Sequence, residues 1–286
     1  SRAVKAHQDQ CRQGWEERMR EEVVEAAVRA LRKAETSLPD WVVKQIEAAA
    51  ERETNPVARL HLQFMLENAR LAEAEGLPLC QDTGLLIFRV EQGRDLRLDF
   101  DLGEALAEGV RRATRDIPLR PNAVEPSTRR NSGDNTGPGI PDIIRETVEG
   151  DGLRLTVFPK GAGSENMSLV GMLNPADDPI DFIVRTVAER AANACPPLFL
   201  GIGLGGTFDL AARLAKRALF SLPGTSETEL MLLKRINALG IGPMGLGGET
   251  TALGVRIESA FCHTASLPVA LNFQCWAHRS ATEVIR

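Results

Sequence analysis

The spacing of hydrophobic residues changes near residue 76. From about residue 19 to residue 75 apolar positions recur at helical intervals, as in Val57, Leu60 and Phe64 at i, i+3 and i+7. Breaks at Pro39 and Pro56 divide this region into three segments. The pattern therefore predicts three helices at the start of the chain.

Capping residues mark the ends of these helices. Asp40 and Asn55 are suited to N-caps, and Pro56 is suited to the first helical position. Gly76, followed by Pro78, supplies a stop signal for the third helix.

Beyond residue 76 short apolar runs alternate with amphipathic stretches. The runs predict strands at residues 85–90, 153–158, 197–202, 252–257 and 268–273. The stretches predict helices at residues 103–115, 179–194, 207–220 and 226–239. This alternation predicts a mixed α/β fold, in which an N-terminal helical layer is followed by an α/β body with glycine-rich loops.

The chain shows no internal repeat and no long linker. We therefore expect one domain over residues 19–286, with a helical part at about 19–76 and an α/β part at about 77–286. Residues 1–18 precede a methionine and are expected to be an extension. A length of 286 residues is sufficient for a substantial hydrophobic core.

Composition excludes several classes of partner. The chain has 34 Lys and Arg against 39 Asp and Glu, a net charge of −5, so no basic field favours nucleic acid or anionic membranes. No apolar stretch approaches the ~20 residues of a membrane span, and the polar start lacks the apolar core of a secretory signal. These features predict a cytoplasmic protein.

Glycine-rich or cysteine-bearing loops lie where the predicted elements end, the usual place for a site on a rigid scaffold. They are residues 78–84, 129–141, 159–166, 194–206 and 241–251. One of them contains Gly201, Gly203 and Gly206 in the order G-x-G-x-x-G, which raises a dinucleotide site as one interpretation. The acidic residue about twenty positions on, Glu227, lies at the start of a predicted helix and not at the end of a strand, so close packing between a strand and a helix is the competing interpretation.

The five cysteines are an odd number and contain no CxxC pair, which predicts reduced thiols or metal thiolates rather than disulfides. Cys80, Cys195 and Cys275 each lie at an element boundary, and Pro78 before Cys80 and Pro196 after Cys195 would stiffen two of these loops. A single cysteine is also a common buried residue. The spacing matches no zinc or ferredoxin motif, so both interpretations stay open.

Six segments in order carry a family resemblance: LPLCQDTG, PLRPNAV, PKGAGSENMS, ACPPLFLGIGLGG, LGIGPMGLGG and CHTASLPVALNFQCWAHR. They resemble the alpha subunit, or N-terminal catalytic part, of the class I iron–sulfur fumarate hydratases and L(+)-tartrate dehydratases. The resemblance covers about residues 20–280. It implies a hydro-lyase that reversibly hydrates fumarate to (S)-malate in the tricarboxylic acid cycle.

The resemblance implies that Cys80, Cys195 and Cys275 hold a [4Fe–4S] cluster. Three ligands leave one iron open to act as a Lewis acid on the substrate. Cys262 is then expected to be an additional buried thiol, and Cys11 lies outside the matching region.

The resemblance also assigns acid–base roles to Asp82 and His263 near the hydroxyl group of the substrate. Their structural alternatives are an Asx-turn for Asp82 and an ordinary loop histidine for His263. Arg120 matches the substrate-binding arginine of the family.

Further contacts to a dicarboxylate are expected from Gln81 and from the backbone at Gly161 and Gly163, where glycine permits close approach to an anion. Arg129, Arg130 and the loop that follows them are weaker candidates.

Single-chain members of the family carry a further C-terminal domain, whereas this chain ends soon after the Cys275 segment. The resemblance therefore implies a beta subunit that completes the active site, and a higher oligomer of alpha–beta pairs. The motifs favour fumarate hydratase. The alternatives are an L(+)-tartrate dehydratase alpha subunit that produces oxaloacetate, or a metal-binding scaffold without catalysis.

Overall fold

The computed structural model describes residues 2–286, with side chains from residue 14 onward, so the side chain of Cys11 lies outside it. The chain forms two compact units. Unit 1 comprises Ser1–Leu38, Leu71–Lys160 and Arg279–Arg286. Unit 2 comprises Pro39–Arg70 and Gly161–His278. Each unit combines stretches that are distant in the sequence.

Unit 1 is built around a four-stranded sheet with the order β2-β1-β3-β8. The strands are β1 (Leu85–Gly93), β2 (Asp142–Val148), β3 (Leu153–Lys160) and β8 (Ala281–Ile285). β1 pairs in parallel with β2 and antiparallel with β3, and β3 pairs antiparallel with β8. Helices α1 (Arg2–Thr36) and α4 (Leu102–Asp116) complete the unit.

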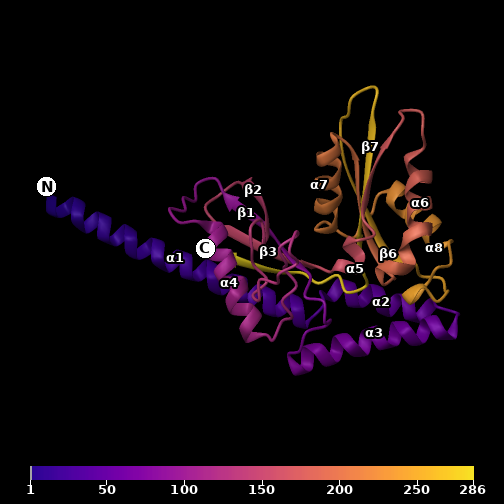
Figure 1. Ribbon diagram of the computed structural model, residues 1–286, viewed down its shortest axis with the longest axis horizontal. Helices are drawn as coiled ribbons and strands as arrows, with labels where there is room; N and C mark the ends of the chain where they lie inside the picture. Colours follow the sequence, from indigo (N-terminus) through magenta and orange to yellow (C-terminus); the bar gives the residue numbers. More distant parts are fainter. Residues whose placement is uncertain (1) are drawn as a thin grey trace. The chain divides into compact units, whose positions relative to one another are not determined.

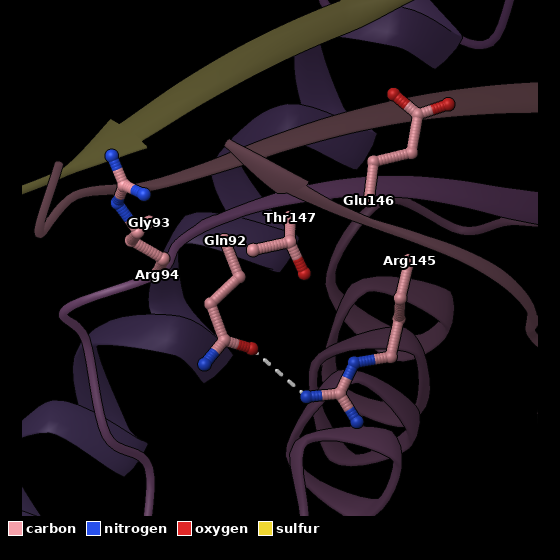
Figure 2. A pocket seen from close by; sticks show the side chains of 6 residues that line it. All are labelled: Gln92, Gly93, Arg94, Arg145, Glu146 and Thr147. Carbon is pink, nitrogen blue, oxygen red and sulfur yellow. Dashed lines mark hydrogen bonds between the residues drawn. The ribbon is translucent and has the colours of Figure 1, made fainter. Parts of the chain in front are cut away.

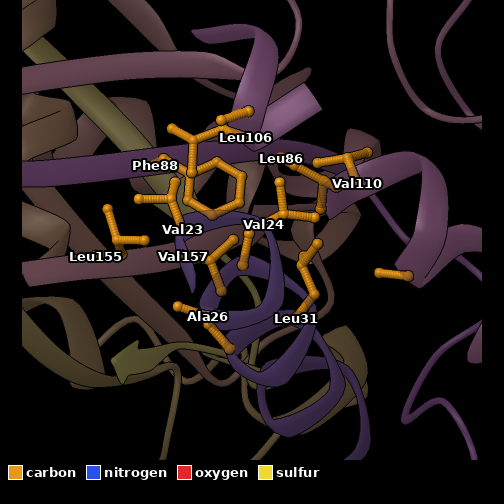
Figure 3. Packing of buried hydrophobic residues seen from close by; sticks show 14 of the residues in the cluster. Val23, Val24, Ala26, Leu31, Leu86, Phe88, Leu106, Val110, Leu155 and Val157 are labelled. Atoms are coloured by element: carbon orange, nitrogen blue, oxygen red, sulfur yellow. The ribbon is translucent and has the colours of Figure 1, made fainter. Parts of the chain in front are cut away.

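The core of unit 1 lies between this sheet and the two helices (Figure 3). Phe88, Leu155 and Val157 point from the strands toward Val24 of α1 and Val110 of α4. The other face carries an ion pair between Arg89 and Glu146 at 2.7 Å and, nearer the loop before β1, the buried pair Ile87 and Phe158. Apolar and polar residues therefore alternate only along the part of β1 and β3 that is distant from this loop.

Unit 2 contains a second four-stranded sheet with the order β4-β7-β5-β6. Its strands are β4 (Leu169–Leu173), β5 (Leu198–Gly205), β6 (Ala252–Ala260) and β7 (Leu267–Gln274). β5 is parallel to β6 and antiparallel to β7. Its helices are α2 (Asp40–Arg52), most of α3 (Pro56–Glu75), α5 (Ala162–Glu165), α6 (Pro179–Arg190), α7 (Phe208–Leu219) and α8 (Glu227–Asn237), with short 3-10 turns at Ala191–Ala194 and Pro243–Gly245.

Helices cover both faces of this second sheet. Leu200 and Ile202 of β5 join a core with α6 and α8, while α7 lies on the opposite face, as Figure 1 shows. Gly201 and Gly203 face α7, because a Cβ atom on either would meet the carbonyl oxygen of Ala215 or Ala211. These glycines of the G-x-G-x-x-G sequence therefore let a helix approach a strand, as the packing interpretation predicted.

The three predicted N-terminal helices are confirmed as α1, α2 (Asp40–Arg52) and α3 (Pro56–Glu75), and the boundary between the units falls within α3. Asn55 accepts hydrogen bonds from the backbone N–H groups of Val57 and Ala58 and is the predicted N-cap. The prediction for Asp40 was wrong. Pro39 occupies the N-cap position and Asp40 is the first helical residue, where its charge favours the positive end of the helix dipole.

The structure confirms the mixed α/β class and all five predicted strands. Sequence reasoning missed β2, β4 and β8, which are short and lie at sheet edges. The predicted helix 179–194 ends at Arg190 and continues as a 3-10 turn. No helix among the described residues combines the length and apolar character needed to cross a membrane.

Candidate active site

The loop between α3 and β1 in unit 1 carries three of the predicted site residues. Asp82 accepts a hydrogen bond from the backbone N–H of Gly84 at 2.9 Å, which is the Asx-turn named above as the structural alternative for this residue. Its own backbone N–H donates to the sulfur of Cys80 at 3.4 Å. Gln81 between them is exposed and Cys80 is half-buried. The turn therefore fixes Asp82 directly beside the thiol.

The end of β3 packs closely against this loop. Gly84 has φ +78°, and a Cβ atom there would meet the backbone of Lys160. Leu85 is paired with Lys160 across the two strands. Glycine at position 84 is thus required both by the backbone conformation and by the close approach of β3.

A buried ion pair supports the same loop. Arg279 donates to Glu35 at 2.5 Å and, through its second terminal nitrogen, to the backbone carbonyl of Asp82 at 2.9 Å. The backbone carbonyl of Glu35 accepts from the N–H of Leu79 at 2.8 Å. Glu35 is 0% exposed and Arg279 is 2% exposed. Sequence reasoning missed this pair, whose members are 244 positions apart.

Burial dominates the electrostatics of this pair. Desolvation raises the pKa of Glu35 to about 7, although the nearby guanidinium of Arg279 lowers it, and the carboxylate of Asp82 raises it further. One carboxylate oxygen of Glu35 has no hydrogen-bond partner. Ionising Glu35 therefore carries a cost in the folded protein that Arg279 offsets only in part.

Two asparagines connect the loop of Arg120 to the loop of Asp82 in unit 1. Asn122 donates its side-chain amide to Asp82 at 3.0 Å, and its backbone N–H donates to Asn135 at 2.6 Å. Asn135 in turn donates to the backbone carbonyl of Arg120 at 3.3 Å. Arg120 itself is exposed. The structure thus brings this predicted cation and the predicted acid into one region.

Asn135 anchors the loop that follows Arg129 and Arg130 through its side-chain hydrogen bonds. It is buried, and its φ of 62° is the left-handed conformation that asparagine tolerates. Its side chain also donates to Thr114 of α4 at 3.2 Å. Arg129 and Arg130 are exposed. The asparagine in the loop therefore supports the Arg120 segment.

Cys195 and Cys275 come together at one end of the sheet in unit 2. Cys195 precedes β5 and Cys275 follows β7, and these strands are antiparallel neighbours. The backbone N–H of Trp276 donates to the carbonyl of Cys195 at 3.3 Å. Cys195 is exposed and Cys275 is half-buried. Two predicted thiol ligands are therefore adjacent, although 80 residues separate them in the sequence.

The glycine loop at 161–163 lies at the same end of unit 2. Ser164 donates to the carbonyl of Gly161 at 3.2 Å and to Gln274, the residue before Cys275, at 3.5 Å. A Cβ atom on Gly163 would lie 4.0 Å from the carbonyl of Asn193 in the turn before Cys195. Gly161 and Gly163 therefore lie near the end of unit 2 that carries the two thiols.

His263 lies at the opposite end of β7. It precedes the strand at Leu267, whereas Cys275 follows it at Gln274. His263 is exposed, and its Nδ1 accepts a hydrogen bond from the backbone N–H of Ala265 at 3.1 Å. Cys262 is also exposed, so the expectation of a buried thiol was wrong. Residues 261–265 of the loop that carries both side chains are all exposed.

The donor chemistry of Cys195 and Cys275 fits an iron–sulfur group, since thiolates are its usual ligands. Cys80 presents a third thiol in unit 1. Within the part of the chain that the structure describes, no group of three or more His, Cys, Asp or Glu residues is gathered around one point. Of the three predicted thiol ligands, Cys80 therefore lies in unit 1, whereas Cys195 and Cys275 lie in unit 2.

A polar cavity in unit 1 contains none of the predicted site residues. Its volume is about 270 Å³ and it lies at the ends of β1 and β2 (Figure 2). Arg145 points toward Gln92 and donates to its side-chain oxygen at 2.9 Å. The remaining lining residues are Gly93, Arg94, Glu146 and Thr147. The lining of this cavity therefore contains neither a cysteine nor a histidine.

Comparisons with known proteins identify the class. The family model described as "Fumarate hydratase (Fumerase)" matches residues 24–284. The chain is 42% identical over 279 residues to "Putative L(+)-tartrate dehydratase subunit alpha" of Methanocaldococcus jannaschii, covering 92% of this chain and 98% of the relative. It is 34% identical over 261 residues to "L(+)-tartrate dehydratase subunit alpha" of Escherichia coli O157:H7, covering 87% and 86%.

The mixed α/β fold and these relatives define a hydro-lyase. The chain belongs to the fumarate hydratase (Fumerase) family, and it corresponds to the alpha subunit of the two-subunit members. The family predicted from the sequence motifs is thereby confirmed. An alpha subunit implies a beta partner, as expected.

Proposed function

We propose that this chain is the alpha subunit of an L(+)-tartrate dehydratase, which removes water from L(+)-tartrate to give oxaloacetate. The observation that carries the proposal is the 42% identity to an archaeal relative of that name over almost the whole of both chains. The E. coli relative carries the same name. These names favour tartrate over the fumarate predicted from the motifs.

Cys80, Cys195 and Cys275 are proposed to hold a [4Fe–4S] cluster. The adjacency of Cys195 and Cys275 in unit 2 supports this assignment, and so does the fixed position of Cys80 beside Asp82 in unit 1. When bound, the cluster supplies a Lewis acid that polarises the departing hydroxyl group. Three protein thiolates leave one iron for that purpose.

The substrate carries two negative charges, so the site needs focused cations and amide donors. Arg120 is proposed to pair with one carboxylate, because guanidinium binds carboxylate through two parallel hydrogen bonds. Gln81 and the backbone at Gly161 and Gly163 are proposed to contact the remaining oxygens. The hydrogen bonds from Asn122 and Asn135 support the assignment, since they fix the Arg120 loop against Asp82.

Dehydration requires a proton for the departing hydroxyl and a base for the hydrogen on the neighbouring carbon. Asp82 is proposed to deliver the proton to the hydroxyl group. His263, which the family resemblance assigns to the same role, lies at the opposite end of β7 from Cys275 in this chain. The opposite-face base is proposed to come from the beta subunit. The C–O bond breaks, water leaves, and the resulting enol rearranges to the ketone of oxaloacetate, so no oxidant or reductant is consumed.

The test is turnover by the alpha and beta subunits purified together after anaerobic reconstitution with iron and sulfide. We expect faster release of oxaloacetate from L(+)-tartrate than hydration of fumarate. Cys275→Ser should lower bound iron and abolish turnover, whereas Cys262→Ser should leave both unchanged. Wild-type iron content in the Cys275→Ser variant would contradict the proposed ligand set.

Fumarate hydration is the second candidate, because the family model that matches residues 24–284 is described by that activity. Rates on fumarate and (S)-malate above those on L(+)-tartrate in the same preparation would favour it. Either outcome retains the hydro-lyase class.

A further inference from the structure

Asp82, the proposed acid, is held by hydrogen bonds at both its backbone and its side chain. Its backbone N–H donates to the sulfur of Cys80 at 3.4 Å. Its carboxylate accepts from the backbone of Gly84 at 2.9 Å and from the side chain of Asn122 at 3.0 Å. Its backbone carbonyl accepts from Arg279 at 2.9 Å. The proposed function uses Asp82 but assigns no role to Arg279.

Glu35, in the last turn of α1, is connected to the chain on both sides of Cys80. Its backbone carbonyl accepts from the N–H of Leu79 at 2.8 Å. Its side chain accepts from Arg279 at 2.5 Å, and Arg279 donates onward to the carbonyl of Asp82. A single residue of α1 therefore fixes the loop before Cys80 directly and after it through Arg279.

Both members of the ion pair are too deeply buried to act on a substrate. Glu35 is 0% exposed and Arg279 is 2% exposed. A group that transfers a proton must come within hydrogen-bond reach, about 3 Å, of the reacting atom. Glu35 and Arg279 can therefore affect the reaction only through the loop that they hold.

Stability alone does not account for a charged pair at this place. Desolvation raises the pKa of Glu35 to about 7, and one of its carboxylate oxygens has no hydrogen-bond partner among the described residues. Apolar side chains of similar volume often stabilise a fold as well as a buried ion pair does, because they avoid the cost of desolvating two charges. An apolar side chain at position 279 would, however, lack the hydrogen bond to Asp82.

A guanidinium group suits this task, since its nitrogens lie in one plane and donate in fixed directions. One terminal nitrogen of Arg279 donates to Glu35 and the other donates to Asp82. The bond to Glu35 therefore sets the direction in which the second nitrogen points. That direction fixes the peptide group between Asp82 and Thr83, which lies inside the Asx-turn.

We propose that Arg279, held in place by Glu35, is a positioning residue that fixes Asp82 beside Cys80 for the reaction. The inference rests on the proposed function for the role of Asp82, and on the hydrogen bonds of unit 1 for the geometry. It adds to the site two residues that touch neither substrate nor cluster.

Two variants of the alpha chain, each purified as the complex with the beta subunit, separate positioning from stability. Glu35→Leu combined with Arg279→Met removes the donor to Asp82 without leaving an unpaired buried charge, so urea unfolding should stay cooperative with a midpoint near that of the wild type. Glu35→Gln is the conservative variant, because its side-chain oxygen can still accept from Arg279.

Steady-state kinetics on L(+)-tartrate gives the first readout. We expect kcat of the double variant to fall about tenfold, because a small displacement of the acid from the reacting atom slows proton transfer. KM should be nearly unchanged, since Asn122 and Asn135, and not Arg279, connect to the Arg120 segment. Glu35→Gln should restore most of the kcat that the double variant loses.

Hydrogen exchange of the same complexes gives a readout that needs no turnover. The backbone N–H groups of Asp82 and Gly84 donate within the loop, so in the double variant they should exchange about tenfold faster than in the wild type. Exchange in β1 should stay at the wild-type rate. Equal acceleration throughout unit 1 would overturn the proposal, because it would show that the pair acts on the stability of the whole unit.

Arg89→Met combined with Glu146→Leu is the matched control. Arg89 and Glu146 form an ion pair at 2.7 Å in the same unit. Arg89 lies in the middle of β1 and Glu146 lies on β2, so this pair joins two strands and not the loop. Both kcat and the exchange of the loop should match the wild type in this control.

Three further results would overturn the proposal. Wild-type kcat in the double variant would show that the reaction does not need Arg279. A higher KM with unchanged kcat would place the effect on substrate binding instead. A loss of kcat in Glu35→Gln as large as in the double variant would show that the charge of Glu35, and not the hydrogen bond from Arg279, is what matters.

The two readouts also separate this inference from the proposed function. A wild-type complex that is inactive on tartrate, malate and fumarate would refute the proposed function. The exchange rates of Asp82 and Gly84 would still decide whether Arg279 holds the loop.

Discussion

Replacing Glu35 by glutamine should make the stability of the protein less dependent on pH. Glu35 is buried beside Arg279, and desolvation raises its pKa from the ordinary value of 4.5 to about 7. Between these values the folded protein holds a proton that the unfolded chain has released. Stability from this group is therefore fully present below pH 4.5 and is lost as the pH rises through 7.

The structure sets the size of this effect. The difference between 4.5 and about 7 corresponds to about 3 kcal/mol of unfolding free energy. Glutamine resembles the protonated carboxyl group in shape and stays neutral at every pH. Relative to the wild type, the Glu35→Gln variant should therefore gain about 3 kcal/mol between pH 4.5 and pH 8.

The assay is urea unfolding of both proteins, followed by circular dichroism at several pH values. Taking the difference between variant and wild type cancels the titration of other groups. Glu283→Gln is the control, since Glu283 forms a partly exposed ion pair with Arg29 at 3.0 Å and should contribute less than ~1 kcal/mol. If the difference in unfolding free energy between Glu35→Gln and the wild type does not change with pH, the carboxyl group has an ordinary pKa in the folded protein. If the difference decreases as the pH rises, the interaction with Arg279 outweighs desolvation and lowers that pKa.

Three further predictions concern single positions. Asn122→Ala removes the hydrogen bond to Asp82 and should lower kcat about tenfold, with little change in KM, whereas an effect on KM alone would contradict a role in positioning Asp82. Gly203→Ala forces a methyl group against α7 and should destabilise the protein by about 1–3 kcal/mol in urea unfolding, while Gly163→Ala, whose Cβ has space, should be tolerated. Ser226→Ala breaks the capping box of α8 and should cost about 1 kcal/mol in the same assay; no change would show that the box contributes nothing.

Local patterns were sufficient for most of the elements but not for the sheet edges. The helical stripe in α4 and the Asn55 cap follow from neighbouring residues, so a sequence reader can find them. β8 has only five residues, and it became a strand because β3 offers an unpaired edge. A signal of that kind is absent from the segment itself.

The site shows the same division. The motif around Cys80 predicted its turn, because the Asx-turn needs only Asp82 and Gly84. Asn122 stood within a quoted motif but was overlooked, since its partner is 40 residues away. The Glu35–Arg279 pair carried no sequence signal, because charged residues are ordinarily exposed.

The sequence by itself determined the family and most of the elements, because each of these depends on residue types in a fixed local order. The tertiary structure decided which distant residues meet. It placed Cys195 beside Cys275 through the antiparallel pairing of β5 and β7, and the same pairing sent His263 to the far end of the sheet. Strand direction is set by long-range hydrogen bonds, so no local pattern could have revealed that separation.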